Sequence, residues 1–315
     1  MNFGKPPVHS AGHIRVHSVL YGNELDRIIT TVKHLNRAAD LAIAAGAAES
    51  VTLIYGDSSP HPLFSDEDVA RLKSECYAIA NIEYHFFDSN LGSALGHNTL
   101  LAAAANSLTA GVAVDSVLIM NPDVMLAPDA LIELARPLFD TKVAMVEARQ
   151  LPIEHPKEYN RSTGETGWAT TACALIPFAV CQELGGFDNE SFFLYCDDVD
   201  FSWRARIEGY KIIYQPSATA FHDKRLDKRG RWAPTHSERY YSAEAALLMA
   251  HKYSRPGILK DLLKQFADSP EDHIRLAAAN FLQRKEEGRL PAPIDPGHKV
   301  SVFDGPFYTK HRFEL

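Results

Sequence analysis

The chain has 315 residues, 46% of them hydrophobic and 23% charged, a composition that is typical of globular proteins and argues against a disordered chain. Its net charge of -8 argues against a nucleic-acid binder, which needs a basic surface. No run approaches the 18 apolar residues of a membrane span, and the first residues lack the apolar segment of a signal peptide. The four cysteines have no CxxC spacing, so we expect reduced thiols in a cytoplasmic protein.

Strand-like and helix-like segments alternate through the first half of the chain. Expected strands cover residues 14–20, 51–55, 82–87, 117–120 and 143–146. Expected helices follow an Asn23–Asp26 capping pair, a Ser65–Asp68 capping pair and Gly92, and a further one covers 128–139. This alternation predicts an α/β fold with a mainly parallel sheet and helices on both faces.

The second half changes character and becomes mostly helical toward its end. Short strands are expected at 170–176, 211–214 and 218–221, and helices at 178–184, 197–208, 238–253, 258–266 and 271–286. We therefore expect an α/β domain of residues 1–225, in two halves at about 14–125 and about 126–225. Residues 226–315 would form a mostly helical C-terminal extension.

Polar loops follow three of the expected strands, and parallel sheets bind ligands at this edge. They contain Tyr21 and Gly22, Asp57, and the pair Asn121 and Asp123. A carboxylate at the end of a buried strand, such as Asp123, suits Mg²⁺ or Mn²⁺ held against a diphosphate. Asn-Pro-Asp is also good turn chemistry, so a turn without a metal is the competing interpretation.

Three carboxylates stand at the start of the helix expected at 197–208. Acids at a helix start complement the helix dipole, and Asp200 can pair with Arg204 one turn later. This explains Asp197 and Asp200 but gives Asp198 no structural role. A carboxylate beside other acids should have a raised pKa, which suits a general base.

Two weaker signals complete the set of candidate residues. Asn90, Gly92, Gly96 and Asn98 surround a helix start that could receive an anion, although glycines there are often only conformational. His222 follows an expected strand, and a lone histidine is more often an ordinary hydrogen-bonding residue than a metal ligand.

Taken in order, three segments resemble the inverting family 2 glycosyltransferases of the GT-A fold, and in particular their bacterial rhamnosyltransferase-like branch. The resemblance covers about residues 14 to 222. The matching segments are NLGSALGHN, VLIMNPDVML and the long block from TGWATTACALIP through FFLYCDDVDFSWRARIEGYKIIYQPSATAFH.

The resemblance implies a role for each matching position. Asp123 stands where the family has the last carboxylate of its metal-binding DxD motif, and His222 matches a histidine that completes the metal or diphosphate site. Asp198 stands at the position of the catalytic base, although Asp197 replaces the usual Glu before it. Asp57 lies in the loop that usually reads the nucleotide base, but YGDSS departs from the usual VDNxS.

The resemblance implies that residues 1–225 are a catalytic domain, with a donor half at about 14–125 and an acceptor half at about 126–225. On the donor side we expect Tyr21, Gly22, Asp57, Asn90, Gly92, Gly96, Asn98 and Asn121. On the acceptor side we expect Trp168, Thr170, Thr171, Asp197 and Asp200, with Trp168 either stacking on a sugar or belonging to the core. The expected donor is dTDP-rhamnose or a UDP-sugar, and the expected acceptor is a glycan or a lipid-linked molecule.

Three questions stay open at this point. The basic segment 224–232 is either a solvated loop or a lid that meets the donor diphosphate or a membrane surface. The terminal helices could pack on the catalytic domain, form a homo-oligomer or bind a partner. A catalytically degenerate scaffold is the main alternative function, and a sugar nucleotidyltransferase would need a basic Gly-rich loop that Tyr21-Gly22-Asn23 does not provide.

Overall fold

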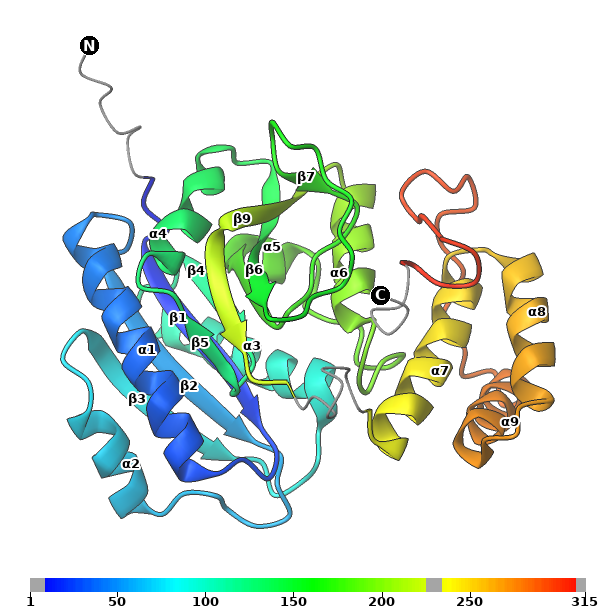
Figure 1. The fold of residues 1–315 in the computed structure, drawn as a ribbon, viewed down its shortest axis with the longest axis horizontal. Helices are drawn as coiled ribbons and strands as arrows, with labels where there is room; N and C mark the ends of the chain where they lie inside the picture. Colours follow the sequence, from blue (N-terminus) through cyan, green and yellow to red (C-terminus); the bar gives the residue numbers. More distant parts are fainter. Residues whose placement is uncertain (1–8, 225–233, 310–315) are drawn as a thin grey trace.

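The computed structural model describes residues 9–224 and 234–309. Within these residues, one nine-stranded sheet is flanked by helices, and a group of three helices lies beside it (Figure 1). The strands are β1 (His13–Leu20), β2 (Ser50–Asp57), β3 (Ile79–Phe86), β4 (Ser116–Met120), β5 (Val124–Leu126), β6 (Val143–Leu151), β7 (Glu165–Thr166), β8 (Cys173–Pro177) and β9 (Lys211–His222).

The helices follow the order expected from the sequence. They are α1 (Leu25–Ala44), α2 (Asp66–Ser74), α3 (Gly92–Thr109), α4 (Ala130–Ala135) continued by a 3₁₀ turn (Arg136–Phe139), α5 (Phe178–Glu183), α6 (Asp197–Ile207), α7 (His236–Lys252), α8 (Pro256–Ala267) and α9 (Asp272–Glu286). None of these described helices is long and apolar enough to cross a membrane.

The strand order is β3-β2-β1-β4-β8-β6-β9-β5, with β7 paired to β9. The first four strands are parallel, and β6 and β9 run in the same direction, while β5, β7 and β8 run against them. The expected mainly parallel sheet is confirmed. The antiparallel strands all lie in the half that follows β4.

Helices cover both faces of the sheet because each face is apolar. One buried cluster packs α1 and α4 against the strands, and another packs α3, α5 and α6 against the opposite face. This two-sided burial explains why β4 is buried along its whole length, with no alternation of exposed residues.

Two details of the elements differ from the sequence-based expectation. Asn23 does not cap α1: the N-cap position is Glu24 without a side-chain bond, and the Asn23 side chain instead accepts from the Tyr21 backbone N–H at 2.9 Å. The strands expected at 211–214 and 218–221 are one strand, β9, whose register against β6 shifts in the middle. Residues 216 and 217 are exposed at this irregularity, so the apolar pattern of the sequence is interrupted there and one strand was predicted as two.

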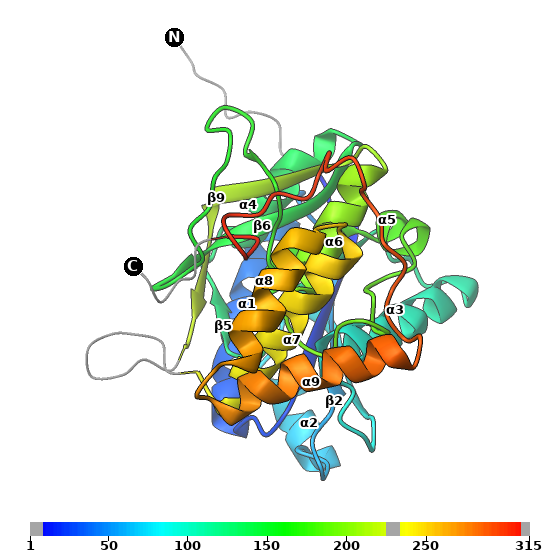
Figure 2. The same cartoon turned by 90° about the vertical axis from the view of Figure 1, so that its right-hand side faces the viewer.

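The terminal helices α7, α8 and α9 form a third buried cluster together with α6 (Figures 1 and 2). Trp203 of α6 packs edge-on against Tyr253 at 4.6 Å between ring centroids, and Phe303 lies 5.4 Å from the same Trp203 ring. The extension expected from residue 226 onward is therefore packed on the helix that carries the acidic cluster. The basic segment expected to be a loop or lid lies, apart from Lys224, outside the described residues.

Candidate active site

The loops after β1 and β2 meet at the carboxyl edge of the sheet. Leu20 and Asp57 are opposite each other in the register of the two strands, and the Ser58 backbone N–H donates to the Leu20 carbonyl at 2.9 Å. The Gly22 N–H donates to the Ser59 hydroxyl at 2.9 Å. Gly22 has a φ of 65°, which glycine adopts without strain. The sequence thus correctly predicted that these two loops converge, and it placed the exposed Tyr21 beside them.

Asp57 is fully buried and organises its own loop. Its carboxylate accepts from the backbone N–H groups of Ser59 and Leu63, each at 2.9 Å, and from the Tyr84 hydroxyl at 2.5 Å. Burial, and then this hydrogen bond, raises the pKa of Tyr84 to about 12. The three donors account for Asp57 as the residue that shapes this loop, and its contact with a nucleotide base stays a prediction.

Asp123 and His222 come together because the short strand β5 pairs with the end of β9. Val124 is opposite His222 in this pairing, and the Asp123 Oδ1 lies 3.2 Å from the His222 Nε2. The Asp123 side chain is 36% exposed, while His222 is nearly buried. The other imidazole nitrogen, Nδ1, lies 2.8 Å from the Gln150 Oε1.

This geometry fits a divalent ion. An amide oxygen can only accept, so Gln150 keeps the proton on the His222 Nδ1 and turns the Nε2 lone pair toward the Asp123 carboxylate. Two electron-pair donors 3.2 Å apart repel each other unless a proton or a cation lies between them. Among the described residues no cluster of three such ligands exists, and Mg²⁺ or Mn²⁺ bound with a diphosphate needs only one or two protein ligands.

Asp198 lies at the first turn of α6, directly after a strained turn. Tyr195 and Cys196 both have positive φ values, 66° and 59°, which are uncommon for side chains of this size and often mark functional sites. The Asp198 carboxylate accepts from its own helix through the Val199 N–H at 2.8 Å and from the Thr171 N–H at 3.3 Å. Burial raises its pKa although these donors oppose the shift.

The two neighbouring acids are buried more deeply than Asp198. Burial and the adjacent Asp198 charge raise the pKa of Asp197 to about 7, and the Ser93 hydroxyl donates to its carboxylate at 2.8 Å. Asp200 is fully buried and pairs with Arg204 at 2.8 Å, as the sequence predicted. Asp200 also contacts Lys252 of α7 at 2.5 Å, so it links α6 to the terminal helices.

The segment from Trp168 to Ala172 connects the Asp123–His222 pair to Asp198. The Asn121 N–H donates to the Ala172 carbonyl at 2.9 Å, next to Asp123, while Thr171 binds Asp198. The Gln150 Nε2 donates to the Thr170 hydroxyl at 2.9 Å, which connects the segment to His222. One segment therefore places the candidate metal ligands and the candidate base at the same edge of the sheet.

Trp168 belongs to a buried aromatic group. Its ring is 7% exposed and packs edge-on against Tyr308 at 4.9 Å and His155 at 5.6 Å. Burial favours the core interpretation of Trp168 over stacking on a sugar. Thr170 and Thr171 are also buried, and their expected contact with an acceptor stays a prediction.

The start of α3 packs closely on its neighbours. A Cβ on Gly92 would lie 2.4 Å from the Phe193 carbonyl, and one on Gly96 would touch Val19 of β1 at 3.0 Å. Asn90 accepts from the Gly92 N–H at 3.1 Å. Asn98 exchanges hydrogen bonds with the backbone of Phe187, at 2.7 and 2.8 Å, which gives it a structural role.

Known proteins with similar sequences are glycosyltransferases. The chain is 25% identical to rhamnosyltransferase WbbL of Escherichia coli K12 over 219 residues, which cover 58% of this chain and 81% of that protein. It is 38% identical over 58 residues to the N-acetylglucosaminyl-diphospho-decaprenol L-rhamnosyltransferase of Mycobacterium tuberculosis, covering 18% of this chain and 19% of that protein. It is 25% identical over 172 residues to the low-salt glycan biosynthesis hexosyltransferase Agl10 of Haloferax volcanii, covering 46% and 54%. No protein-family model matches the chain.

Solved structures of glycosyltransferases share the fold. The mannosyltransferase PcManGT of Pyrobaculum calidifontis, in complex with GDP-Man and Mn²⁺, aligns with a TM-score of 0.53 at 16% identity, covering 88% of this chain and 81% of that one. GalNAc-T7 with UDP, GalNAc and Mn²⁺ aligns with a TM-score of 0.62 at 10% identity, covering 91% and 57%. The chain therefore has the GT-A fold and is similar in sequence to rhamnosyltransferases and a hexosyltransferase.

Three residues that lie beside the site were missed in the sequence analysis. Gln150 and Glu147 are buried polar residues of β6, and Lys157 follows in the loop after it. A polar residue in an otherwise apolar strand was the available signal for the first two. No feature of the sequence indicates that Lys157 is buried, because a lysine in a loop is normally solvated.

Proposed function

We propose that this protein is an inverting glycosyltransferase that moves a sugar from dTDP-rhamnose or a UDP-sugar to the hydroxyl group of an acceptor. The observation that carries the proposal is the placement of the Asp123–His222 pair and Asp198 at one edge of the sheet, joined by the segment 168–172. Asp123 and His222 would hold Mg²⁺ or Mn²⁺, which neutralises the leaving nucleoside diphosphate when bound.

Each of the chain's own residues has a defined task in this reaction. Asp198 accepts the proton of the acceptor hydroxyl as its oxygen forms a bond to the anomeric carbon. The bond from that carbon to the diphosphate breaks on the opposite face, so the configuration inverts. The loops at Gly22 and Asp57 enclose the nucleotide, with Asn121 beside the diphosphate.

The acceptor side adjoins an apolar cavity of about 450 Å³. It lies between the turn at Tyr195 and Cys196 and the terminal helices, and its lining includes Met249, Phe266 and Phe307. The turn leads directly into Asp197 and Asp198. The cavity therefore favours an acceptor with an apolar part, such as a lipid-linked sugar, over a free glycan.

The experiment that tests this function measures sugar transfer by Asp198→Asn. General base catalysis contributes roughly 10²- to 10⁴-fold, so we expect kcat to fall by about that factor while donor affinity stays close to wild type. Asp129→Asn is the matched control, because Asp129 is exposed and its side chain forms no cap bond. Wild-type kcat in Asp198→Asn, or a product with retained configuration, would refute the proposal.

The same assay distinguishes acceptors. With a lipid-linked sugar and its free glycan compared at equal concentration, we expect a lower KM for the lipid-linked form. Ile274→Glu, which places a charge at a half-buried position of the cavity wall, should remove that advantage without changing KM for the free glycan. Equal KM values for the two acceptors would exclude the cavity as an acceptor site.

A further inference from the structure

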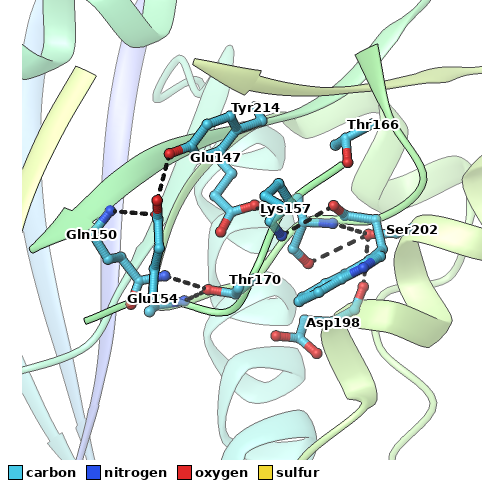
Figure 3. Close-up of polar contacts among 12 residues, drawn as sticks. Glu147, Gln150, Glu154, Lys157, Thr166, Thr170, Asp198, Ser202 and Tyr214 are labelled. Carbon is cyan, nitrogen blue, oxygen red and sulfur yellow. Dashed lines mark hydrogen bonds and ion pairs between the residues drawn. The ribbon is translucent and has the colours of Figure 1, made fainter. Parts of the chain in front are cut away.

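A buried lysine lies under the acceptor side of the site. The Lys157 side chain is 3% exposed, and its Nζ lies 2.8 Å from the Oε2 of Glu147, whose side chain is fully buried (Figure 3). Two apolar residues of similar size usually stabilise a protein core at least as well as a buried ion pair does. A contribution to stability alone therefore does not explain why this buried ion pair is present.

The Lys157 ammonium also holds the segment that carries the site together. It lies 3.3 Å from the centroid of the Trp168 ring and donates to the Trp168 carbonyl at 3.3 Å. The next residues bind α6: the Ala169 N–H donates to the Ser202 hydroxyl at 3.1 Å, and that hydroxyl donates to the Asp198 carbonyl at 2.8 Å. Contacts therefore run from Lys157 through the segment 168–169 and Ser202 to the backbone of Asp198.

The Lys157 charge also acts on the ionisation of Asp198. Burial raises the pKa of Asp198, and the Lys157 charge opposes that shift. On its own helix Asp198 faces Asp197 and the Cys196 thiol, whose pKa values are both raised by burial and by the Asp198 charge. These two groups provide no positive charge to offset the burial of Asp198.

The other charged groups nearby are already paired. Asp200 is neutralised by Arg204 and Lys252. Burial raises the pKa of Glu147 to about 7, with Lys157 opposing the shift and Glu154 adding to it. Glu147 therefore holds Lys157 in place and weakens its field as it ionises.

We propose that Lys157 is a positioning residue of the acceptor site, which anchors the segment 168–171 against α6 and supplies a fixed positive charge that favours the ionised, proton-accepting form of Asp198. Glu147 and the Trp168 ring hold the ammonium in place. The inference rests on the proposed role of Asp198 as the base.

The test compares two variants, of which the first leaves the Lys157 ammonium with only the Trp168 carbonyl and ring as partners and the second leaves no charge at the pair. Glu147→Gln retains the lysine, and Lys157→Met with Glu147→Gln removes both charges. In the pH profile of kcat, the acid limb reports the protonation of the base in the enzyme–substrate complex. For Glu147→Gln we expect the midpoint of the acid limb at the same pH as in wild type or at a lower pH. For the double variant we expect the midpoint to rise by about one pH unit, because the cation that favours the ionised base is lost.

If Lys157 has only a structural role, both variants should lose kcat or stability, and the midpoint of the acid limb should stay at the wild-type pH. An unchanged limb in the folded double variant overturns the inference. If thermal unfolding shows that this variant does not fold, Lys157→Gln with Glu147→Gln replaces it, since two amides can bond to each other. Lys157→Arg keeps the charge and should keep the limb within a few tenths of a unit of wild type.

Asp198→Asn, measured in parallel, separates the two levels of the proposal. Full activity in that variant refutes the role of Asp198 itself. Loss of activity in Asp198→Asn together with an unmoved limb in the double variant refutes only the role of Lys157.

Discussion

Asp197 is a buried carboxyl group beside a second acid, and its ionisation opposes folding. Burial and the adjacent Asp198 charge raise its pKa to about 7, well above the usual range of an aspartic acid. A raised folded-state pKa contributes stability that is fully present below the unfolded pKa and is lost as pH rises through about 7. Asp197→Asn can still accept the Ser93 hydroxyl bond and has no charge to bury.

We therefore expect Asp197→Asn to be more stable than wild type at pH 8, by on the order of 2 kcal/mol. The difference should shrink toward zero as pH falls to about 4. Urea unfolding of both proteins between pH 4 and 8 measures it. A stability difference that is independent of pH would show that Asp197 is ionised as easily in the folded chain as in the unfolded one.

Gln150 illustrates a residue whose importance lies in what it orients. It fixes the proton on the His222 Nδ1 and bonds Thr170 on the other side. Gln150→Leu should weaken Mn²⁺ binding by about 10- to 100-fold, as is typical when the partner of a metal-binding histidine is lost. Isothermal titration with Mn²⁺ and a nucleoside diphosphate checks this, and unchanged affinity would place His222 outside the metal site.

At the scale of elements, α6 and α7 are held together by buried charge. Lys252 of α7 contacts Asp200 at 2.5 Å and Asp188 at 2.6 Å, and the Tyr253 hydroxyl donates to Asp200 at 3.0 Å. Removing one partner of a buried pair leaves an uncompensated charge and typically costs about 3 kcal/mol or more.

Lys252→Met should therefore lower the free energy of unfolding by about 3 kcal/mol. Arg239→Ala is the matched control, since its 2.8 Å pair with Glu271 also joins two terminal segments but is exposed, and we expect a loss of less than about 1 kcal/mol. Chemical denaturation of the three proteins gives both values. Equal losses in the two variants would contradict the buried role of Lys252.

Elements with strong local signals were predictable, and those that depend on distant pairing were not. The Ser65–Asp68 capping box is present as expected, because a cap is formed by residues three positions apart. The strands β5 and β7 have three and two residues, and both exist because β9 offers a pairing edge. No local pattern specifies a strand of that length.

The same distinction applies to the site. Asp123, Asp198 and His222 stand out by type and by position at the ends of predicted elements. The burial of Asp200 by Lys252, and the charge of Lys157 near Asp198, arise from contacts between segments about 40 to 60 residues apart in the sequence. Such contacts leave no spacing that could be recognised in a single sequence.

At the scale of the whole molecule, the catalytic region and the terminal helices share one core. Trp168, Phe192 and Trp203 lie in the same buried cluster as the side chains of α7, α8 and α9. The chain from the last helix returns to this cluster, where Arg206 donates to the Val300 carbonyl at 2.6 Å. The terminal helices therefore complete the core beneath α6.

We expect a single cooperative thermal transition for the full chain, with equal calorimetric and van't Hoff enthalpies. A chain ending at residue 224 should lose that transition, because it exposes the apolar face of α6 and leaves Asp200 without Lys252. Differential scanning calorimetry checks both expectations. Two separate transitions in the full chain would show that residues 234–309 fold as an independent unit.

The measurement that most directly tests the central claim is nucleotide binding by thermal shift in the presence and absence of Mn²⁺, for wild type and Asp123→Ala. A ligand that binds only the folded state raises Tm by mass action. We predict a Mn²⁺-dependent rise in Tm with one of UDP, dTDP or GDP, and we expect Asp123→Ala to lose this rise while its Tm without ligand stays at the wild-type value. No rise with any nucleotide, or the same rise in Asp123→Ala, would contradict a donor site at Asp123 and favour a catalytically degenerate scaffold.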